Sequence, residues 1–258
     1  MAEPRVVVVT GASQGIGRSL ATAFAARGDI VVLAARNVAG LEETATQVEA
    51  AGGEASVIQC DVTEEASVSA LATTVFERHG RIDVLVNNSG VGGPSGRLWE
   101  LDPADWAAAF AVNVTGVFLV SRALLPFMIE RGSGSVIVIG SISGKRPLFG
   151  RSAYTSTKMA LVGLTRTLAV EAGQHGVRVN LISPGFVAGP RLDWVIEAQA
   201  KARAITADEV RAEFAAESPL QRLTEAEDVA DVAVFLASDA ANAITGADVN
   251  VNSGVVMY

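Results

Sequence analysis

The chain has 258 residues, of which 50% are hydrophobic and 19% are charged. This composition is typical of a folded protein with a large buried core and excludes a disordered chain. The net charge of −8 argues against a general affinity for nucleic acid or anionic membranes. The one cysteine, Cys60, rules out an internal disulfide framework and a cysteine-cluster metal site.

Short apolar runs alternate with longer helical segments along the chain. The runs are nearly continuous in β-branched and aliphatic residues, which indicates strands buried on both faces of a sheet. Strands that alternate with helices favour right-handed crossovers. The sequence therefore predicts an α/β fold with a Rossmann-like, doubly wound, mainly parallel sheet of seven strands, at residues 5–10, 30–35, 55–60, 82–87, 135–140, 177–182 and 248–251.

Several helix starts are readable between these runs. Thr63, followed by two glutamates, is predicted as an N-cap, and Asp102 and Pro103 as an N-cap and the first helical residue. Segments 206–209 and 224–227 both have the capping-box pattern. Each of these sites predicts the beginning of a helix.

One segment interrupts the alternation, after the sixth strand. Residues 191–217 look helical, and ligands of open α/β sheets bind beyond the carboxyl ends of the strands. An insertion at about 186–220 is therefore placed to act as a lid that excludes water; a packing appendage is the alternative. No linker or repeat divides the chain, so residues 1–258 are predicted to form a single domain.

The apolar runs also bear on localisation. The run before the first helix is too short for a secretory signal, and the longest apolar runs fall short of a membrane span. We therefore expect a soluble, cytoplasmic protein in a reducing compartment. Cys60, in an apolar run, is expected to be a packed core thiol.

A glycine-rich turn follows the first strand, in the segment TGASQGIG at 10–17. Glycines allow a tight turn and a close approach of the backbone to a phosphate group, and the following helix N-terminus supplies free N–H groups. The turn therefore predicts a dinucleotide site, with a bare structural turn as the alternative.

Tyr154 and Lys158 are four residues apart, so on a helix they share one face. An ammonium beside a phenol favours the phenolate and brings the phenol pKa towards neutral pH. Ser141 follows an apolar run and so lies at the carboxyl end of a predicted strand, where its hydroxyl could stabilise charge on a substrate oxygen. This pattern favours proton transfer to or from a carbonyl or hydroxyl group.

Taken together, the glycine cluster, Asn87-Asn88-Ser89-Gly90, Asn113, Ser141 and Tyr154…Lys158 have the order and spacing of one family. The chain resembles the short-chain dehydrogenase/reductase family over essentially its whole length. The resemblance implies that Tyr154 is the general acid/base, that Lys158 lowers its pKa and holds the nicotinamide ribose, and that Ser141 binds the substrate oxygen. It also implies that Asn113 anchors a water-mediated proton relay.

The resemblance further implies a nicotinamide cofactor. Ala35 occupies the position where NAD-binding members carry an acid, and Arg36 follows it, which favours NADP(H). NAD(H) stays possible, since Gln14 replaces a basic residue that is common in NADP-binding members. The implied cofactor contacts are Gly11, Ser13, Gln14, Gly15, Ile16, Gly17, Arg36, Asp61, Val62, Asn87, Ser89, Gly90, Tyr154, Lys158, Pro184, Gly185 and Val187.

The expected activity is the NADP(H)-dependent interconversion of a carbonyl compound and a secondary alcohol. Ser143, Phe149, Phe186 and Trp194 are candidate pocket residues for a small-molecule substrate. The basic side chains of Lys145, Arg146 and Arg151 keep a second hypothesis open, a 3-oxoacyl-thioester (acyl carrier protein) reductase, although solvated surface charges are the more ordinary explanation of these residues.

A third hypothesis is a non-catalytic, dinucleotide-binding regulator on the same fold. No metal site is predicted, because the two histidines are far apart and each precedes a glycine. The resemblance implies a homo-oligomer, a dimer or a homotetramer, paired through the helices that carry Asn113 and Tyr154.

Overall fold

The computed structural model describes residues 3–146 and 148–258, and within them it has one sheet of seven strands, all paired in parallel. The order across the sheet is β3-β2-β1-β4-β5-β6-β7. The strands are β1 (Val6–Thr10), β2 (Ile30–Ala35), β3 (Glu54–Gln59), β4 (Val84–Asn87), β5 (Gly134–Ile139), β6 (Val177–Pro184) and β7 (Asp248–Val251). The predicted fold class is confirmed, and no strand end differs from its predicted place by more than two residues.

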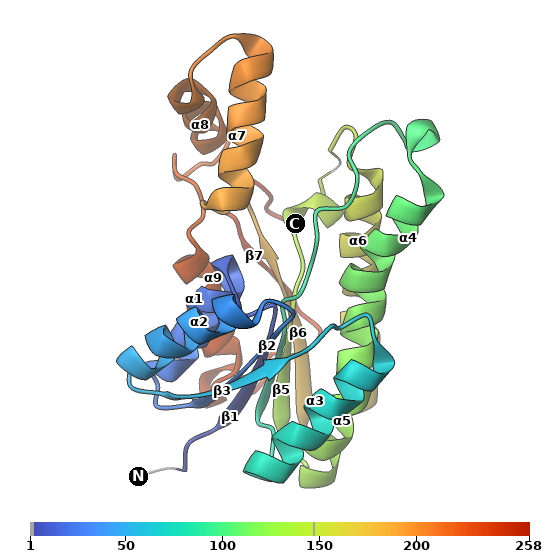
Figure 1. Cartoon of the computed structure of the whole chain (residues 1–258), viewed down its shortest axis with the longest axis vertical. Helices are drawn as coiled ribbons and strands as arrows, with labels where there is room; N and C mark the ends of the chain where they lie inside the picture. The colour runs from blue at the N-terminus through green and yellow to red at the C-terminus, as the bar shows by residue number, and fades with distance from the viewer. Residues whose placement is uncertain (1–2, 147) are drawn as a thin grey trace.

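Helices cover both faces of this sheet (Figure 1). One face packs against α1 (Gly15–Ala25), α2 (Val38–Ala50) and α9 (Ala226–Leu236), and the other against α3 (Glu65–His79), α5 (Gly116–Arg131) and α6 (Ser152–Gly173). In β1, Val7 and Val9 belong to the first core, and Val6 and Val8 to the second. Because successive side chains point to opposite faces, a strand covered on both sides must be apolar throughout.

The connections after β1, β4, β5 and β6 meet at the carboxyl edge of the sheet. The strand order reverses between β1 and β4, which is the usual place for a ligand in an open α/β sheet. At this edge the Thr10 hydroxyl accepts hydrogen bonds from the backbone N–H groups of Asn88 (3.0 Å) and Ser89 (3.1 Å). These bonds hold the connections after β1 and β4 together.

Two of the predicted helix starts are confirmed. Asp102 caps α4 (Pro103–Phe110) by accepting from the N–H of Ala104 at 2.7 Å, with Pro103 as first helical residue. Thr206 and Glu209 form the predicted capping box of α8 (Ala207–Ala216).

The other two predicted starts are wrong by one residue. α3 begins after Glu64, because the Thr63 hydroxyl donates to the Asp61 carboxylate instead of capping the helix. The capping box of α9 joins Glu225 to Asp228, because Thr224 pairs with Val187 in an isolated parallel bridge. In both places the threonine that was expected to cap the helix makes a contact outside the helix instead.

The insertion after β6 forms two helices, α7 (Pro190–Arg203) and α8, rather than one continuous helix. The break lies at Ala204, whose backbone is left-handed (φ 53°). The pair encloses its own small core of Leu192, Ile196, Ala200 and Val210. In Figure 1 it stands beyond the carboxyl edge of the sheet, as predicted for a lid.

A π-helical turn, η2 (Ala111–Thr115), connects α4 directly to α5, so the three elements form one continuous helical stretch. By length and composition, the stretch Pro103–Arg131 is apolar enough to cross a membrane, contrary to the sequence-based expectation. Half of its most apolar window is buried, and α5 packs on the sheet, so the apolar character serves the protein core.

Candidate active site

The glycine turn joins β1 to α1 in a conformation that side chains would block. Gly11 has φ +66°, and a Cβ on Gly17 would lie 2.2 Å from the carbonyl oxygen of Gly11. The Asn88 amide donates to the carbonyls of Thr10 (2.9 Å) and Gly11 (3.2 Å), which fixes the turn from the β4 side. Asn88, which was not among the predicted cofactor contacts, is therefore a structural brace of the turn.

The start of α1 faces open space. Gly15 is exposed, with nothing within 4 Å of its Cβ position, and Gln14 at the N-cap makes no side-chain capping bond. The first N–H groups of α1 are thus left for a ligand, and helix N-termini favour phosphate. Ser13 and Ile16 flank the turn, with Ile16 half-buried on the core.

One basic and one acidic side chain lie next to each other after β2 and β3. Arg36 follows β2 with its side chain 70% exposed, 3.7 Å from the Asp61 carboxylate. The N–H and hydroxyl of Thr63 donate to this carboxylate and lower the pKa of Asp61, and Arg36 adds to the effect. Ala35 and Val62 are both buried, and β2 ends in Ala35 rather than in an acid.

Tyr154, Lys158 and Ser141 are brought together by the start of α6 and the end of β5. Burial alone would raise the pKa of Tyr154, but the charges of Lys158 and Arg191, a hydrogen bond with Ser141 and the charge of Arg151 lower it. The phenol is therefore held below its ordinary pKa of about 10. This is the direction needed for a general acid/base at neutral pH.

Lys158 is buried, with 5% of its surface exposed, and its Nζ donates to the carbonyl oxygen of Ile139 at 2.9 Å. Burial lowers its pKa, opposed by the developing charge of Tyr154, and Arg191 lowers it further. Its Nζ lies 5.8 Å from the centre of the Tyr154 ring. The helical spacing inferred from the sequence thus sets the two groups side by side.

Asn113 is fully buried in the π-helical turn η2. Its Oδ1 accepts from the N–H of Val91 (2.8 Å), and its Nδ2 donates to the carbonyl of Val91 (3.0 Å) and to the hydroxyl of Thr157 (3.0 Å). A Cβ on Gly90 would lie 3.3 Å from Asn113 Oδ1 and 3.6 Å from Lys158 Nζ. The structure therefore joins Asn113 to the loop after β4 and to α6, beside Lys158.

Ser141 is the N-cap of a short 3₁₀ turn after β5 and its Oγ accepts from the N–H of Ser143 at 3.1 Å. This bond leaves the Ser141 hydroxyl proton free to donate. Ser143 is itself 94% covered, so its hydroxyl is the less accessible of the two.

The remaining predicted cofactor contacts lie along the same carboxyl edge. Asn87 is buried and donates to Ser121, while its Oδ1 has no partner within the described residues. Pro184 ends β6, Gly185 packs on Asn252 so tightly that a Cβ would lie 2.8 Å from it, and Val187 bridges to Thr224. These residues therefore lie at the ends of β4 and β6 or directly after β6, on the same edge of the sheet as the glycine turn.

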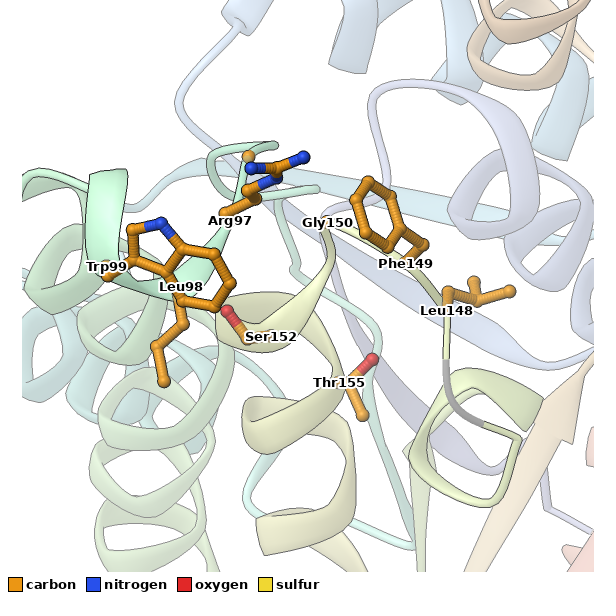
Figure 2. Close-up of a pocket in the computed structure, with 9 residues that line it drawn as sticks. Arg97, Leu98, Trp99, Leu148, Phe149, Gly150, Ser152 and Thr155 are labelled. Atoms are coloured by element: carbon orange, nitrogen blue, oxygen red, sulfur yellow. The ribbon is translucent and has the colours of Figure 1, made fainter.

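The predicted pocket residues do not gather in one place. Phe149 is 89% and Trp194 69% exposed, whereas Phe186 packs edge-on against Phe214 of the lid at 4.7 Å. Figure 2 shows a surface hollow of about 320 Å³ beside α6 that includes Phe149, Leu98 and Trp99, next to Ser152 and Thr155. The hollow includes only Phe149 of the predicted pocket residues.

The three basic side chains named from the sequence, Lys145, Arg146 and Arg151, have different partners. Lys145 Nζ lies 2.9 Å from the buried carboxylate of Asp248, and Arg146 Nη1 lies 2.7 Å from the exposed carboxylate of Glu217. Arg151 instead donates to Ser95 (2.6 Å) and to the carbonyl of Gly92 (2.7 Å). Of these three side chains, only Arg151 has no acidic partner among the described residues.

Arg191, the second residue of α7, was missed by the sequence reasoning. Its charge acts on both Tyr154 and Lys158. The available signal was a basic residue directly after Gly189-Pro190, where the lid begins. The sequence did not show this role, because Arg191 is far along the chain from Tyr154 and Lys158.

These residues fit a nicotinamide dinucleotide. An uncapped helix N-terminus and a turn too tight for side chains suit the pyrophosphate, and a buried lysine beside a phenol suits the reacting end. Within the described residues, no group of three or more His, Cys, Asp or Glu side chains is placed to hold a metal ion.

Three similarities identify the family. A family model described as "Enoyl-(Acyl carrier protein) reductase" matches residues 11–256. A cis-4-hydroxycyclohexanecarboxylate dehydrogenase from Sinomonas cyclohexanicum is 38% identical over 251 residues, which cover 97% of this chain and 96% of that protein. A variant of the actinorhodin polyketide ketoreductase, solved with NADPH, superimposes with a TM-score of 0.95 at 34% identity and 100% coverage of both chains.

A further solved structure, an NAD⁺-bound xylitol dehydrogenase, superimposes with a TM-score of 0.92 at 30% identity, covering 97% of this chain and 98% of that one. Structural neighbours thus bind NAD⁺ or NADPH, in accord with a nicotinamide dinucleotide here. From its whole-length match, its fold and its relatives, the chain belongs to the short-chain dehydrogenase/reductase family of oxidoreductases.

Proposed function

We propose that this protein is an NADP(H)-dependent oxidoreductase that interconverts a ketone and a secondary alcohol, with Tyr154 as general acid/base. The observation that carries the proposal is the position of Tyr154 beside the buried Lys158, whose Nζ lies 5.8 Å from the centre of the Tyr154 ring. The charges of Lys158 and Arg191 and the Ser141 hydroxyl lower the pKa of Tyr154 against the opposing effect of burial. A phenol in this setting can exchange a proton at neutral pH.

In the reductive direction, the bound nicotinamide supplies the hydride. The hydroxyls of Ser141 and Tyr154 hydrogen-bond the substrate carbonyl oxygen, where negative charge develops. Tyr154 Oη then donates its proton to that oxygen, and the resulting phenolate is stabilised by Lys158. Asn113 positions the loop after β4 beside Lys158, where a water can pass the replacement proton.

The preference for NADP(H) rests on the end of β2. Ala35 offers no carboxylate to a ribose 2′-hydroxyl, and Arg36 is exposed enough to meet a 2′-phosphate bidentately. The nearby Asp61 draws Arg36 at 3.7 Å, longer than a hydrogen bond, so a phosphate competes well for the guanidinium.

The substrate class follows from the surroundings of Tyr154. We propose a medium-sized carbonyl compound or secondary alcohol, enclosed by the lid formed by α7 and α8 within a single domain of residues 1–258. The name of the relative from Sinomonas cyclohexanicum describes a secondary alcohol on a carboxylated ring, which supports this class.

A second candidate is a 3-oxoacyl-thioester reductase acting on an acyl carrier protein. A relative from Synechocystis named 3-oxoacyl-[acyl-carrier-protein] reductase is 36% identical over 256 residues, which cover 98% of both chains, and its name favours this candidate. Against it, Lys145 and Arg146 are each paired with an acid, so they offer little to an acidic carrier.

The test is Tyr154→Phe, which removes the acid/base hydroxyl and keeps the ring. We expect cofactor binding, followed by protein fluorescence, to persist, and ketone reduction to fall by about 10²- to 10⁴-fold. Undiminished turnover would rule out the role of Tyr154. A wild-type protein that binds cofactor but turns over no ketone, alcohol or acetoacetyl thioester would instead support a non-catalytic regulator.

A further inference from the structure

Two arginines from different walls of the site converge on one point beside Tyr154. A Cβ built on Gly92 would lie 3.2 Å from Arg151 Nη2 and 3.6 Å and 4.0 Å from Arg191 Nη2 and Nε. Arg151 stands directly before α6, and Arg191 is in the first turn of the lid helix α7. The loop after β4, through Gly92, lies between them.

Neither charge is compensated by the protein. Within residues 3–146 and 148–258, no carboxylate oxygen lies within 4.0 Å of either guanidinium group, whereas Arg146 and Lys145 nearby both have acidic partners. Arg151 uses its two terminal nitrogens on Ser95 and Gly92. Arg191 is exposed and its side chain makes no hydrogen bond among the described residues, so its donors are available to a ligand.

Hydrogen bonds orient the Arg151 side chain, and the start of α7 fixes the backbone of Arg191. Ser95 and the Gly92 carbonyl orient Arg151, whose Cζ lies 5.3 Å from the centre of the Tyr154 ring. Gly189 begins α7 with φ +134°, a conformation that suits glycine, and Pro190 then fixes the first turn that carries Arg191. Holding two cations together without an anion is unfavourable, so the arrangement is suited to a bound negative group.

We propose that Arg151 and Arg191 form a subsite for a carboxylate on the substrate, so that the preferred substrate is an oxo acid or hydroxy acid. The inference rests on the proposed ketone–alcohol chemistry and specifies its substrate class. A guanidinium fork binds the two carboxylate oxygens in a fixed plane. Bound carboxylate bridges the lid to the rigid wall of α6 and thereby directs the substrate's carbonyl towards Tyr154 and Ser141.

The position of the pair also says which anion it receives. The Arg151 guanidinium lies against the Tyr154 ring itself, so the negative group must be a few bonds from the reacting carbon. In a carrier-bound thioester, the phosphate is separated from the carbonyl by the long pantetheine arm. The subsite is therefore too close to the reacting centre for a carrier phosphate, and it suits an anionic group of the substrate itself, which we propose is a carboxylate.

The experiment compares each oxo acid with its own methyl ester. 4-Oxopentanoate, 5-oxohexanoate and 4-oxocyclohexanecarboxylate, with their methyl esters, are assayed with NADPH and with NADH. For at least one pair we expect the acid to have a kcat/KM at least about tenfold above its ester. Arg191→Ala should lower the acid-to-ester ratio about 10- to 100-fold. Because each ratio is taken at one pH, changes in the acidity of Tyr154 cancel.

Three further variants make the result specific. Arg151→Ala should reduce the ratio as Arg191→Ala does, and Arg191→Gln repeats the charge loss with a side chain of similar size. Arg27→Ala removes one charge from an exposed position at the end of α1 and should leave the ratio unchanged. Thermal unfolding of each variant shows whether it is folded.

The outcomes separate the two proposals. If ketones and esters are reduced but every acid-to-ester ratio stays near one and does not respond to Arg191→Ala, the carboxylate subsite is wrong and the proposed function stands. If cofactor binds and no carbonyl compound is reduced, the proposed function fails and the subsite with it. If acetoacetyl-coenzyme A alone is reduced and loses activity with Arg191→Ala, the anion belongs to the carrier, which also overturns the subsite.

Discussion

At the scale of single residues, charge decides what the site can do, because its reactive groups are few and nearly enclosed. Three cations, Lys158, Arg151 and Arg191, act on Tyr154, and no acid is among the causes of its lowered pKa. The phenolate form is therefore stabilised before any ligand arrives. Removing any of these three charges in a variant should therefore raise the pKa of Tyr154.

This electrostatic setting predicts a pH dependence. Alcohol oxidation needs the phenolate of Tyr154, so kcat/KM for oxidation should rise with pH up to the pKa of Tyr154, which lies below its ordinary value. Arg191→Gln removes a charge that lowers this pKa, so the rising limb of the oxidation profile should move to higher pH. Arg27→Ala should not move it. A profile that shifts downwards, or not at all, in Arg191→Gln would contradict the assigned electrostatics.

A second residue-scale prediction concerns Arg36. Its guanidinium is mostly exposed and only loosely drawn to Asp61, so Arg36→Ala should leave folding intact. The KM for NADPH should rise by about tenfold or more, while the KM for NADH changes little. Both constants are measured with one ketone at saturation. Equal rises for the two cofactors would remove the 2′-phosphate argument.

At the scale of elements, glycines mark where the backbone itself forms the site. Gly17→Ala forces a Cβ to within 2.2 Å of the Gly11 carbonyl, where no flexible side chain can move aside. We expect a loss of about 1–3 kcal/mol in the free energy of unfolding and a weakened affinity for both cofactors. Urea unfolding and a fluorescence titration measure the two effects.

Gly163→Ala is the matched control for this substitution. Gly163 is in the middle of α6, is exposed, and has nothing within 4 Å of its Cβ position. Alanine there should stabilise the protein by about 0.5–1 kcal/mol and leave cofactor affinity unchanged. Destabilisation by Gly163→Ala of the same size as by Gly17→Ala would show that the clash is not the cause.

The elements also show what could be predicted from the sequence and what could not. The strands were readable because burial on both faces makes each run apolar by itself, as in Val6–Thr10. Helix starts at Thr63 and Thr224 were misplaced because contacts with Asp61 and Val187 compete with capping. Local sequence patterns therefore predict strands and helix starts correctly where no contact with a residue outside the element competes.

The same distinction applies to the candidate site. Asn113, Ser141, Tyr154 and Lys158 could be named from motif spacing, and the structure gathers them at one edge of the sheet. The convergence of Arg151 and Arg191 could not be predicted from motif spacing, because it depends on the position of α7 relative to the sheet. No local pattern in the sequence encodes that placement.

At the scale of the whole molecule, one outer face is unusually apolar. Phe118 of α5 and Met159 and Val170 of α6 are all about half exposed or more. A shallow hollow of about 180 Å³ lies on α5 and α6 between the side chains Phe118, Ser121, Arg122, Leu125, Leu164 and Leu168. Apolar patches of this kind are typical of contact surfaces.

We therefore expect two copies to associate through α5 and α6. Sedimentation at micromolar concentration should give a dimer or a tetramer, and Phe118→Glu should shift it towards the monomer by placing a charge in the contact. Phe149→Glu, which changes an even more exposed aromatic side chain elsewhere, is the control and should leave the mass unchanged. A wild-type protein that sediments as a monomer would refute the expectation.

The π-helical turn that holds Asn113 has a consequence for how such a protein can change. A π turn contains one residue more than an ordinary helix needs, so deleting one residue from Ala111–Thr115 would restore regular hydrogen bonding between α4 and α5. The deletion would also rotate α4 relative to α5 and carry Asn113 away from Val91 and Thr157. We expect the shortened protein to resist heat at least as well as the wild type and to lose ketone reduction, because Asn113 no longer reaches these partners.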